Sequence, residues 1–261
     1  MVSRREHRSE RILAQLRQKG TVSIEGLIES LGASAPSIRR DLARLEAQGL
    51  VRRTHGGATL VEELLYEPFR FDASFQSREH HFTNEKRHIA ATAADMIKEG
   101  ETVGFTAGTT TTRVARNIRN RTKISVITNA LNIGMELCNM PGIKTFVTGG
   151  NVQWAWSFSL AGQAAIESLK DRFMDKLFLS VIGIDSDRGA TLNEPDEALT
   201  FRAMVRQAKQ VIVVADSSKL GIVAAALICP IEEVHILVTD SGASNEAIAG
   251  FTNHGIQVIR V

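Results

Sequence analysis

The chain has 261 residues, of which 43% are hydrophobic, and its 31 Lys and Arg side chains nearly balance its 29 Asp and Glu side chains. This composition supports a sizeable buried core and excludes a disordered chain, while the length allows two domains. The charge is unevenly placed, because residues 1–60 hold 11 basic and 6 acidic side chains (+5) and residues 61–261 hold 20 and 23 (−3). A basic front module suggests an anionic partner for that end only.

No targeting or membrane segment is expected. The first ten residues carry charges without an apolar run behind them, and the longest apolar stretch, residues 222–231, is interrupted by Pro230. A span needs roughly 20 apolar residues, so neither a signal peptide nor a membrane partner is predicted. Cys138 and Cys229 lie far apart without a C-x-x-C motif, which predicts a cytoplasmic location, no disulfide and no zinc site. Both cysteines are expected to be buried small hydrophobes.

Residues 1–60 are predicted to form three short helices and a hairpin. Apolar residues at helical spacing place the helices over about 3–19, 23–32 and 34–49, and Ser23 and Ser34 are good N-cap residues. Two short β-like runs follow around the sequence H-G-G, which is typical of a hairpin. The pattern is that of a winged helix-turn-helix, whose third helix enters the major groove of DNA.

The third predicted helix has two chemically different faces. Ile38, Leu42 and Leu45 form an apolar face, while the opposite face is polar and basic. The planar fork of arginine suits guanine edges and phosphates, so double-stranded DNA is favoured over the alternative, a basic bundle that contacts proteins. The predicted DNA-binding residues are Ser34, Ser37, Arg39, Arg40, Arg44, Arg52, Arg53 and His55.

This stretch resembles the N-terminal signature of the DeoR family of bacterial transcription regulators. The family elements S-x-x-T-I-R-R-D-L, L-E-x-x-G and R-x-H-G-G-A match residues 34–42, 45–49 and 53–58, with Ser37 where threonine is usual. Ser37 keeps a hydroxyl, so phosphate contact is expected to survive with some change in base preference. The resemblance implies a regulator that binds operator DNA.

Residues 61–83 are predicted to be a linker between the front domain, residues 1–60, and a second domain, residues 84–261. The linker is rich in charges and aromatic residues, and Pro68 argues against one continuous helix. His80, His81 and His88 suggest a metal site, but no carboxylate or cysteine stands at ligand spacing, so solvated histidines and no bound metal are favoured.

From residue 84 onward, apolar strands alternate with helical segments. The expected strands include T-V-G-F, S-V-I-T, T-F-V-T, L-F-L-S-V-I-G-I, Q-V-I-V-V-A, H-I-L-V-T and I-Q-V-I-R-V. Such alternation predicts a mostly parallel sheet covered by helices on both faces, which is a doubly wound α/β domain.

The sequence F-T-A-G-T-T-T-T-R, residues 105–113, joins a strand to a helix. Unpaired backbone N–H groups and threonine hydroxyls at a helix N-terminus suit a phosphate, although an ordinary helix cap would have the same sequence. Polar residues at other strand ends support a ligand site, because ligands of open α/β sheets bind outside the carboxyl ends of the strands. The predicted effector-binding residues are Thr106, Gly108, Thr109, Thr110, Thr111, Asn129, Gly149, Gly150, Asp185, Asp216 and Lys219.

The second domain resembles the sensor domain of the same family, which is related in fold to ribose 5-phosphate isomerases and coenzyme A transferases. The family pattern D-x-G-T-T, T-N, G-G, G-I-D and A-D-S-S-K occurs in order, with Thr106 in place of the acidic or serine residue. The resemblance implies a phosphorylated sugar effector, no cofactor, and a homo-oligomer, a dimer or tetramer, with paired DNA-binding modules. It also implies a repressor of a carbohydrate catabolic operon.

Three functions compete on this evidence: a ligand-controlled transcription regulator, a sugar-phosphate isomerase with an accessory DNA-binding module, and another kind of nucleic-acid protein. Asp185, Asp216 and Lys219 could move protons, but fold kinship does not establish turnover, so the regulator without enzyme activity is favoured. Two details stay open. Trp154 and Trp156 either line the pocket or belong to the core, and Asp196 and Glu197 are expected to be first-turn partners of a helix dipole.

Overall fold

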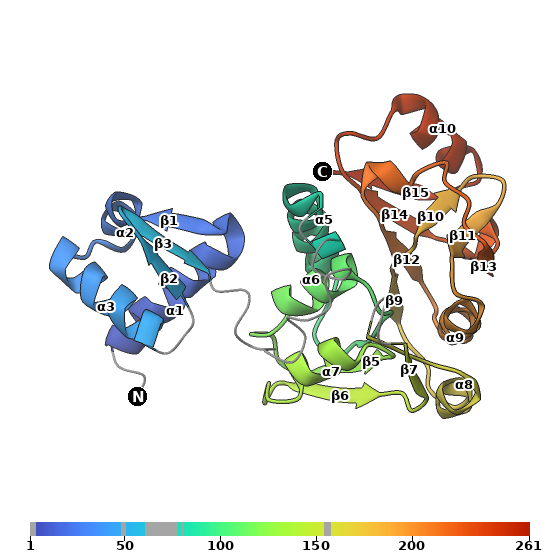
Figure 1. Ribbon diagram of the computed structural model, residues 1–261, viewed down its shortest axis with the longest axis horizontal. Coiled ribbons are helices and arrows are strands. Elements are labelled where there is room, and N and C mark those ends of the chain that lie inside the picture. The colour runs from blue at the N-terminus through green and yellow to red at the C-terminus, as the bar shows by residue number, and fades with distance from the viewer. Residues whose placement is uncertain (1–3, 48–50, 61–77, 80, 154–157) are drawn as a thin grey trace. The chain divides into compact units, whose positions relative to one another are not determined.

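The computed structural model describes residues 4–47, 51–60, 78–79, 81–153 and 158–261 (Figure 1). The chain forms two compact units, Met1–Phe71 and Asp72–Val261. The division falls inside the predicted linker 61–83. The second unit therefore begins before the predicted boundary at residue 84, and the described residues 78, 79 and 81–83 belong to it.

The first unit consists of three helices and a small antiparallel sheet. Its elements are α1 (Arg4–Lys19), β1 (Thr21–Ser23), α2 (Ile24–Leu31), α3 (Ala35–Ala47), β2 (Val51–Thr54) and β3 (Gly57–Leu60). The strands pair antiparallel in the order β1-β3-β2. The predicted three helices and hairpin are confirmed, whereas the three-residue strand β1 was not predicted because it is too short to show an alternating pattern.

The core of the first unit contains the predicted apolar face of α3. Ile38, Leu42 and Leu45 are buried together with Ile12, Leu16 and Leu27 of the other two helices. The hairpin packs so closely on β1 that a Cβ atom at Gly57 would lie 1.9 Å from the carbonyl oxygen of Val22. Glycine at this position is therefore required by the contact between β1 and β3.

The second unit is built on a seven-stranded sheet in which every pair of neighbouring strands is parallel. The strand order is β15-β14-β12-β9-β4-β5-β6. The strands are β4 (Thr102–Phe105), β5 (Ile124–Thr128), β6 (Ile143–Val147), β9 (Lys176–Leu179), β12 (Val211–Val214), β14 (Ile236–Thr239) and β15 (Gln257–Arg260). The predicted doubly wound α/β fold is confirmed.

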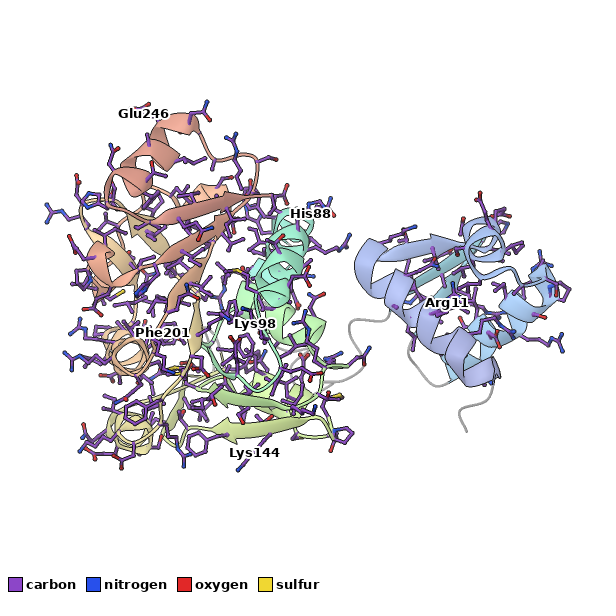
Figure 2. All side chains as sticks on the ribbon, turned by 180° about the vertical axis from the view of Figure 1, so that it is seen from behind. Arg11, His88, Lys98, Lys144, Phe201 and Glu246 are labelled. Atoms are coloured by element: carbon purple, nitrogen blue, oxygen red, sulfur yellow. The ribbon has the colours of Figure 1, made fainter. Side chains whose placement is uncertain are left out.

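Helices cover both faces of this sheet, with α5, α6 and α7 on one side and α8 and α9 on the other (Figure 1). The helices are α5 (Thr83–Asp95), α6 (Thr109–Asn117), α7 (Leu131–Leu137), α8 (Gln163–Leu169), α9 (Pro195–Arg206) and α10 (Asn245–Asn253). Side chains fill the space between the helices and the sheet (Figure 2). In the part of the chain that the structure describes, no helix has the length and apolar character needed to cross a membrane.

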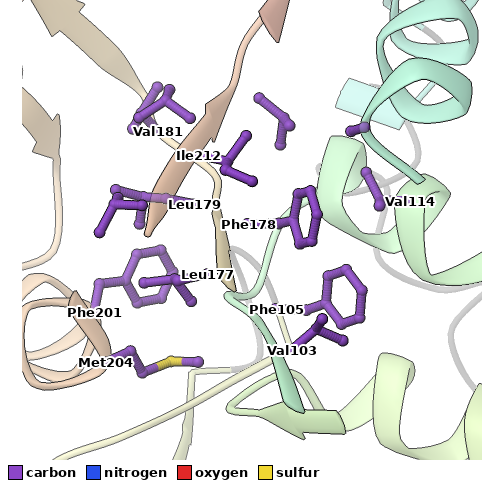
Figure 3. Close-up of a cluster of buried hydrophobic side chains, with 14 of the residues drawn as sticks. Val103, Phe105, Val114, Leu177, Phe178, Leu179, Val181, Phe201, Met204 and Ile212 are labelled. Carbon is purple, nitrogen blue, oxygen red and sulfur yellow. The ribbon is translucent and has the colours of Figure 1, made fainter. Parts of the chain in front are cut away.

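The centre of the sheet carries the core of the second unit. Phe105 of β4 and Phe178 of β9 stack with their ring centroids 5.3 Å apart, and apolar residues from both helical layers close around them (Figure 3). Strand order reverses between these two strands, because β4, β5 and β6 proceed to one edge while β9, β12, β14 and β15 proceed to the other. A reversal of this kind opens a crevice at the carboxyl ends of the two central strands.

The predicted strand over residues 177–184 is wrong, since the chain breaks there into two strands of different sheets. Strand β9 ends at Leu179, and β10 (Gly183–Asp185) pairs antiparallel with β11 (Gly189–Leu192) in a separate sheet completed by β13 (Ala226–Cys229). Both halves of the run are apolar because both are buried, so periodicity alone does not reveal the break. A short hairpin of β7 (Asn151–Gln153) and β8 (Ser159–Ala161) was also not predicted.

The two cysteines lie in different environments. Cys229 is buried in β13, and burial raises the pKa of its thiol to about 12. The expectation that Cys138 is also buried is wrong: it follows the last residue of α7, is exposed, and donates a hydrogen bond from its thiol to the carbonyl oxygen of Met135 at 3.2 Å.

Candidate functional site

The N-terminal turn of α3 presents small polar and basic side chains to solvent. The carbonyl oxygen of Ser34 accepts from the backbone N–H groups of Ser37 and Ile38, at 2.9 and 3.0 Å, and the two serine hydroxyls lie 3.0 Å apart. Arg39 and Arg40 are exposed, and the Nε of Arg40 donates to the carbonyl oxygen of Pro36 at 3.2 Å. Because Ile38 is buried, the helix is fixed with this basic side outward.

The remaining predicted DNA-binding residues divide into two groups. Arg52 and His55 are exposed on the hairpin. Arg44 instead donates to the hydroxyl of Ser9 on α1 at 2.6 Å. The Nε of Arg53 lies 2.6 Å from a carboxylate oxygen of Glu46. These contacts give Arg44 and Arg53 structural roles, and their DNA contacts stay predictions.

A cavity of about 120 Å³ lies in the second unit at the point where strand order reverses. Much of its lining follows three neighbouring strands: Ala107, Gly108, Thr109 and Thr110 after β4, Ser180, Val181 and Ile182 after β9, and Asp216, Ser218 and Lys219 after β12. The arrangement matches the general position of ligand sites in open α/β sheets.

The turn from β4 into α6 forms one wall of this cavity. A Cβ atom at Gly108 would lie 2.5 Å from the Cβ of Ser180, so only glycine allows β4 and β9 to approach this closely. The backbone N–H of Thr112 donates to the carbonyl oxygen of Gly108 at 3.0 Å and makes the first hydrogen bond of α6. No described residue accepts from the N–H groups of residues 108–111. These groups lie at the positive end of the helix dipole, which favours an anion.

The predicted threonines play different parts in this turn. Thr109 and Thr110 line the cavity. The buried hydroxyl of Thr106 accepts from the backbone N–H of Ser180 at 2.9 Å, and that of Thr111 donates to the carbonyl oxygen of Gly108 at 3.0 Å. Thr106 and Thr111 therefore hold the turn in place.

Two lysines give the cavity positive charge. Lys86 of α5 is 3% exposed, and burial lowers its pKa to about 8, with Asp216 opposing this shift and Lys219 adding to it together with Arg113 and Arg78. Burial also lowers the pKa of Lys219, against the attraction of Asp216. Neither lysine forms an ion pair within 4.0 Å with a described residue. Their charges are therefore available to an anion.

The cavity lining also contains carboxylate side chains, whose negative charge opposes that of the lysines. Asp216 is 1% exposed and accepts from the hydroxyl of Ser218, while Glu194 and Glu197 line the cavity at the start of α9. Glu197 was expected to be only a first-turn partner of the helix dipole. It does lie in the first turn, but it is also buried, whereas Asp196 is exposed.

The other predicted effector residues lie outside the lining of the cavity. Asn129 is buried, and its side-chain oxygen accepts from the N–H of Ala107 at 3.0 Å. Asp185 accepts from the N–H groups of Asp187 and Arg188, at 3.0 and 2.9 Å. Gly149 and Gly150 lie in the turn after β6 and do not line the cavity either. Trp154 and Trp156 lie outside the described residues.

Several residues of the cavity were not predicted. Arg78 and His81 line it although they belong to the predicted linker, and the ring of the exposed His81 packs edge-on against Phe82. Lys86 lies one helical turn before Ile89 and Ala90, on the buried side of α5. A lysine at a position where the helical spacing calls for an apolar residue was the sequence signal that could have identified it as a site residue.

The histidine cluster has no metal-site geometry among the residues that the structure describes. They include no group of three or more His, Cys, Asp or Glu side chains that could hold a metal ion. His88 is exposed on α5 (Figure 2), and His80 lies outside the described residues.

The turn that carries Lys219 is anchored from the neighbouring strand. Asp240, which follows β14 and is 5% exposed, accepts from the N–H of Ser217 at 2.6 Å and from its hydroxyl at 2.9 Å. A bridge between Ile184 and Leu220 ties the same turn to β10. The turn that carries Lys219 is therefore held by β12, which precedes it, by Asp240 after β14, and by β10.

Comparison with known proteins agrees with both units. Residues 8–63 match the DeoR-like helix-turn-helix domain, and residues 81–241 match the DeoR C-terminal sensor domain. The chain is 34% identical to the putative aga operon transcriptional repressor of Escherichia coli O157:H7, over 97% of this chain and 93% of that protein. It is also 34% identical to the transcriptional repressor GlcR of Bacillus subtilis (strain 168), over 90% and 88% of the two chains.

Among solved structures, ribose 5-phosphate isomerase A from Neisseria gonorrhoeae aligns with a TM-score of 0.39 and 12% identity, over 54% of this chain and 53% of the other.

The two domain matches and the similar repressors show that the chain belongs to the DeoR family, and the resemblance found in the sequence motifs is confirmed. The protein is therefore a DNA-binding transcriptional regulator.

Proposed function

We propose that this regulator represses a carbohydrate catabolic operon and that a sugar phosphate bound in the cavity controls it. The observation that carries the proposal is the set of open N–H groups at residues 108–111 beside Lys86 and Lys219. A helix N-terminus and ammonium groups together neutralise a phosphate, and low exposure strengthens each contact.

The carboxylates give the same cavity a means to recognise a sugar. Asp216 and Glu194 are acceptors for hydroxyl groups, and the hydroxyls of Thr110 and Ser180 act as donors or acceptors. In this proposal Asn129 and Asp185 act through the turns that they hold rather than by direct contact. The similarity to the aga operon repressor supports a carbohydrate operon.

For the DNA, we propose that the exposed side of α3 reads the operator and that the hairpin contacts the backbone. Ser34, Ser37, Arg39 and Arg40 lie at the helix end that enters a major groove in this class of fold, and Arg52 and His55 are exposed nearby on the hairpin. We further propose a homo-oligomer, because paired modules match operators with two half-sites, and a cytoplasmic location, where bacterial DNA lies.

A thermal-shift screen tests the effector. The panel contains ribose 5-phosphate, glucose 6-phosphate, fructose 6-phosphate, galactosamine 6-phosphate, glycerol 3-phosphate and inorganic phosphate. A ligand at a hundredfold its dissociation constant adds roughly 2.7 kcal/mol of stability. We expect a shift with at least one sugar phosphate and its loss in Lys219→Ala. The exposed Lys98→Ala is the matched control. A panel without any shift would contradict the proposed effector class.

Isomerase activity is the second candidate, because the cavity places the buried Asp216 beside Lys219. We propose binding without turnover, since Asp216 and Lys219 both have a use in recognition and isomerisation needs a base within reach of a carbon-bound proton. Incubation with aldose and ketose phosphates, followed by proton exchange at the adjacent carbon, is the direct test. Exchange above background that is lost in Asp216→Asn would establish the enzyme.

A further inference from the structure

Lys86 lines the cavity and also contacts the residues just before α5, which do not follow any strand of the sheet. Its Nζ donates to the carbonyl oxygens of Arg78 and His81, at 2.5 and 2.7 Å, and its side chain lines the cavity. An ammonium group has three N–H donors. The third donor of Lys86 has no acceptor among the described residues, although the side chain is 3% exposed.

The segment that Lys86 contacts, residues 78, 79 and 81–83, is also held by the helix that borders the cavity. We name it the coupling segment. From α6, Arg113 donates to the carbonyl oxygen of Glu79 at 3.2 Å, and Arg116 donates to the Glu79 carboxylate at 2.5 Å. Arg78 and His81 place side chains in the cavity lining. The segment is therefore fixed by groups that a cavity ligand would touch or neighbour.

The position of the coupling segment in the sequence gives these contacts a consequence. It follows the stretch that joins the two units, and it leads directly into α5. In the sequence, the coupling segment is therefore the first described part of the second unit after the DNA-binding unit.

We propose that an anion in the cavity accepts the third N–H of Lys86, fixes the coupling segment against the second unit, and thereby alters DNA binding. Lys86 is in this account a positioning residue that links the two functions. The inference rests on the proposed phosphate site and adds the route of regulation. A bound anion offsets the cost of burying the ammonium, which strengthens the two carbonyl contacts at the same time.

A purely structural Lys86 would behave differently. It would hold the two carbonyl groups equally well with or without an anion, so ligand binding would leave the coupling segment unchanged. The two roles are therefore separated by the response of the segment to a ligand. Stability alone does not separate them.

Amide hydrogen exchange of the full-length protein, with inorganic phosphate as the probe, measures that response. We expect phosphate to slow exchange of the amides of residues 78–86 by about 5- to 150-fold in the wild type, the usual range of coupling between sites. Lys86→Met leaves both carbonyls without a donor, so Lys86→Gln, which retains an N–H donor, is measured beside it. Lys98→Met is the control for loss of an exposed lysine.

The inference predicts that phosphate slows exchange in the wild type and in Lys98→Met, and by less than about twofold in both Lys86 variants. Unchanged exchange in the wild type, or equal slowing in the Lys86 variants, would overturn it. Operator binding gives the second readout, since the sugar phosphate of the panel that binds should change the operator Kd in the wild type but not in Lys86→Gln. If no sugar phosphate of the panel gives a thermal shift while inorganic phosphate slows exchange, the sugar effector alone is refuted.

Discussion

The two units present positive charge to an anion in opposite ways. On α3, Arg39 and Arg40 are exposed, and the neighbouring hairpin adds Arg52. In the cavity, Lys86 and Lys219 are largely enclosed and have lowered pKa values. Exposed charge attracts a polyanion, and salt screens that attraction. An enclosed ammonium group has lost hydrogen bonds to water, so it favours a small anion that enters the cavity and accepts hydrogen bonds in place of water. The same kind of charge thus serves a large partner in one unit and a small ligand in the other.

The largest effect is expected where buried charges hold the second unit together. Glu136 of α7, with 1% of its side chain exposed, accepts from Arg116 at 2.9 Å and also pairs with Arg119. Glu136→Ala removes the buried carboxylate that Arg116 and Arg119 share and leaves Arg116 with Glu79 as its remaining carboxylate partner, which should lower the free energy of unfolding by about 3–5 kcal/mol. Urea unfolding measures it, and Glu167→Ala, which removes an exposed pair with Lys170, is the control. A loss as small as that of the control would show that burial does not govern these pairs.

The second effect concerns DNA. Replacing both Arg39 and Arg40 by Ala should weaken operator binding by about 1–3 kcal/mol for each arginine that reads a base, and should reduce its salt dependence. The fold should stay intact, because both side chains are exposed. Fluorescence anisotropy at several salt concentrations is the measurement. Unaltered affinity and salt slope would remove α3 as the DNA reader.

The third effect is a difference in pH dependence between the two regions. Lys86 loses its proton as the pH rises through about 8, so the affinity of the cavity for phosphate should fall about tenfold between pH 7 and pH 9. The ligand for this test is a sugar phosphate, which is mainly a dianion in this range because the second pKa of a phosphate monoester is about 6. Operator binding through arginine should not change, since guanidinium remains charged. Calorimetric titration with the sugar phosphate that binds gives the profile, and a flat profile would contradict the role of Lys86.

The smallest effect is expected at an exposed pair of the first unit. Glu46→Ala removes the partner of Arg53, and with side chains 37% and 50% exposed the pair should contribute less than about 1 kcal/mol of stability. Operator affinity should rise slightly, because a carboxylate that repels phosphate is lost. Thermal unfolding and anisotropy report the two changes. A loss of stability as large as that of Glu136→Ala would contradict the claim that the exposed ion pair of the first unit contributes less than the buried pairs of the second.

Much of the fold was predictable because burial has a clear period. The spacing of Ile38, Leu42 and Leu45 revealed the inner face of α3, and the apolar strands revealed the parallel sheet. The break at Ser180 was not predictable, because the residues on both sides of it are buried and apolar. The order of the strands in the sheet, which determines where the crevice opens, was also not predictable, because no short stretch of sequence encodes it.

The site was predictable only where it follows the strands in sequence. Residues 108–110, Asp216 and Lys219 come directly after β4 and β12, and all of them line the cavity. Asn129 follows β5 and Asp185 is the last residue of β10, but both side chains accept hydrogen bonds from backbone N–H groups instead. Lys86 reaches the cavity from a helix before the first strand of the sheet, and only the packed structure brings it there.

The central claim is that one small anion in the cavity controls DNA binding, and a single titration tests it. Operator affinity is measured with increasing concentrations of the sugar phosphate that binds, for the wild type and for Lys219→Ala. The account predicts that the ligand changes the operator Kd of the wild type by about 5- to 150-fold. Lys219→Ala should bind operator normally without ligand and show no change at the same concentrations. An equal response of the two proteins, or no response of the wild type, would contradict it.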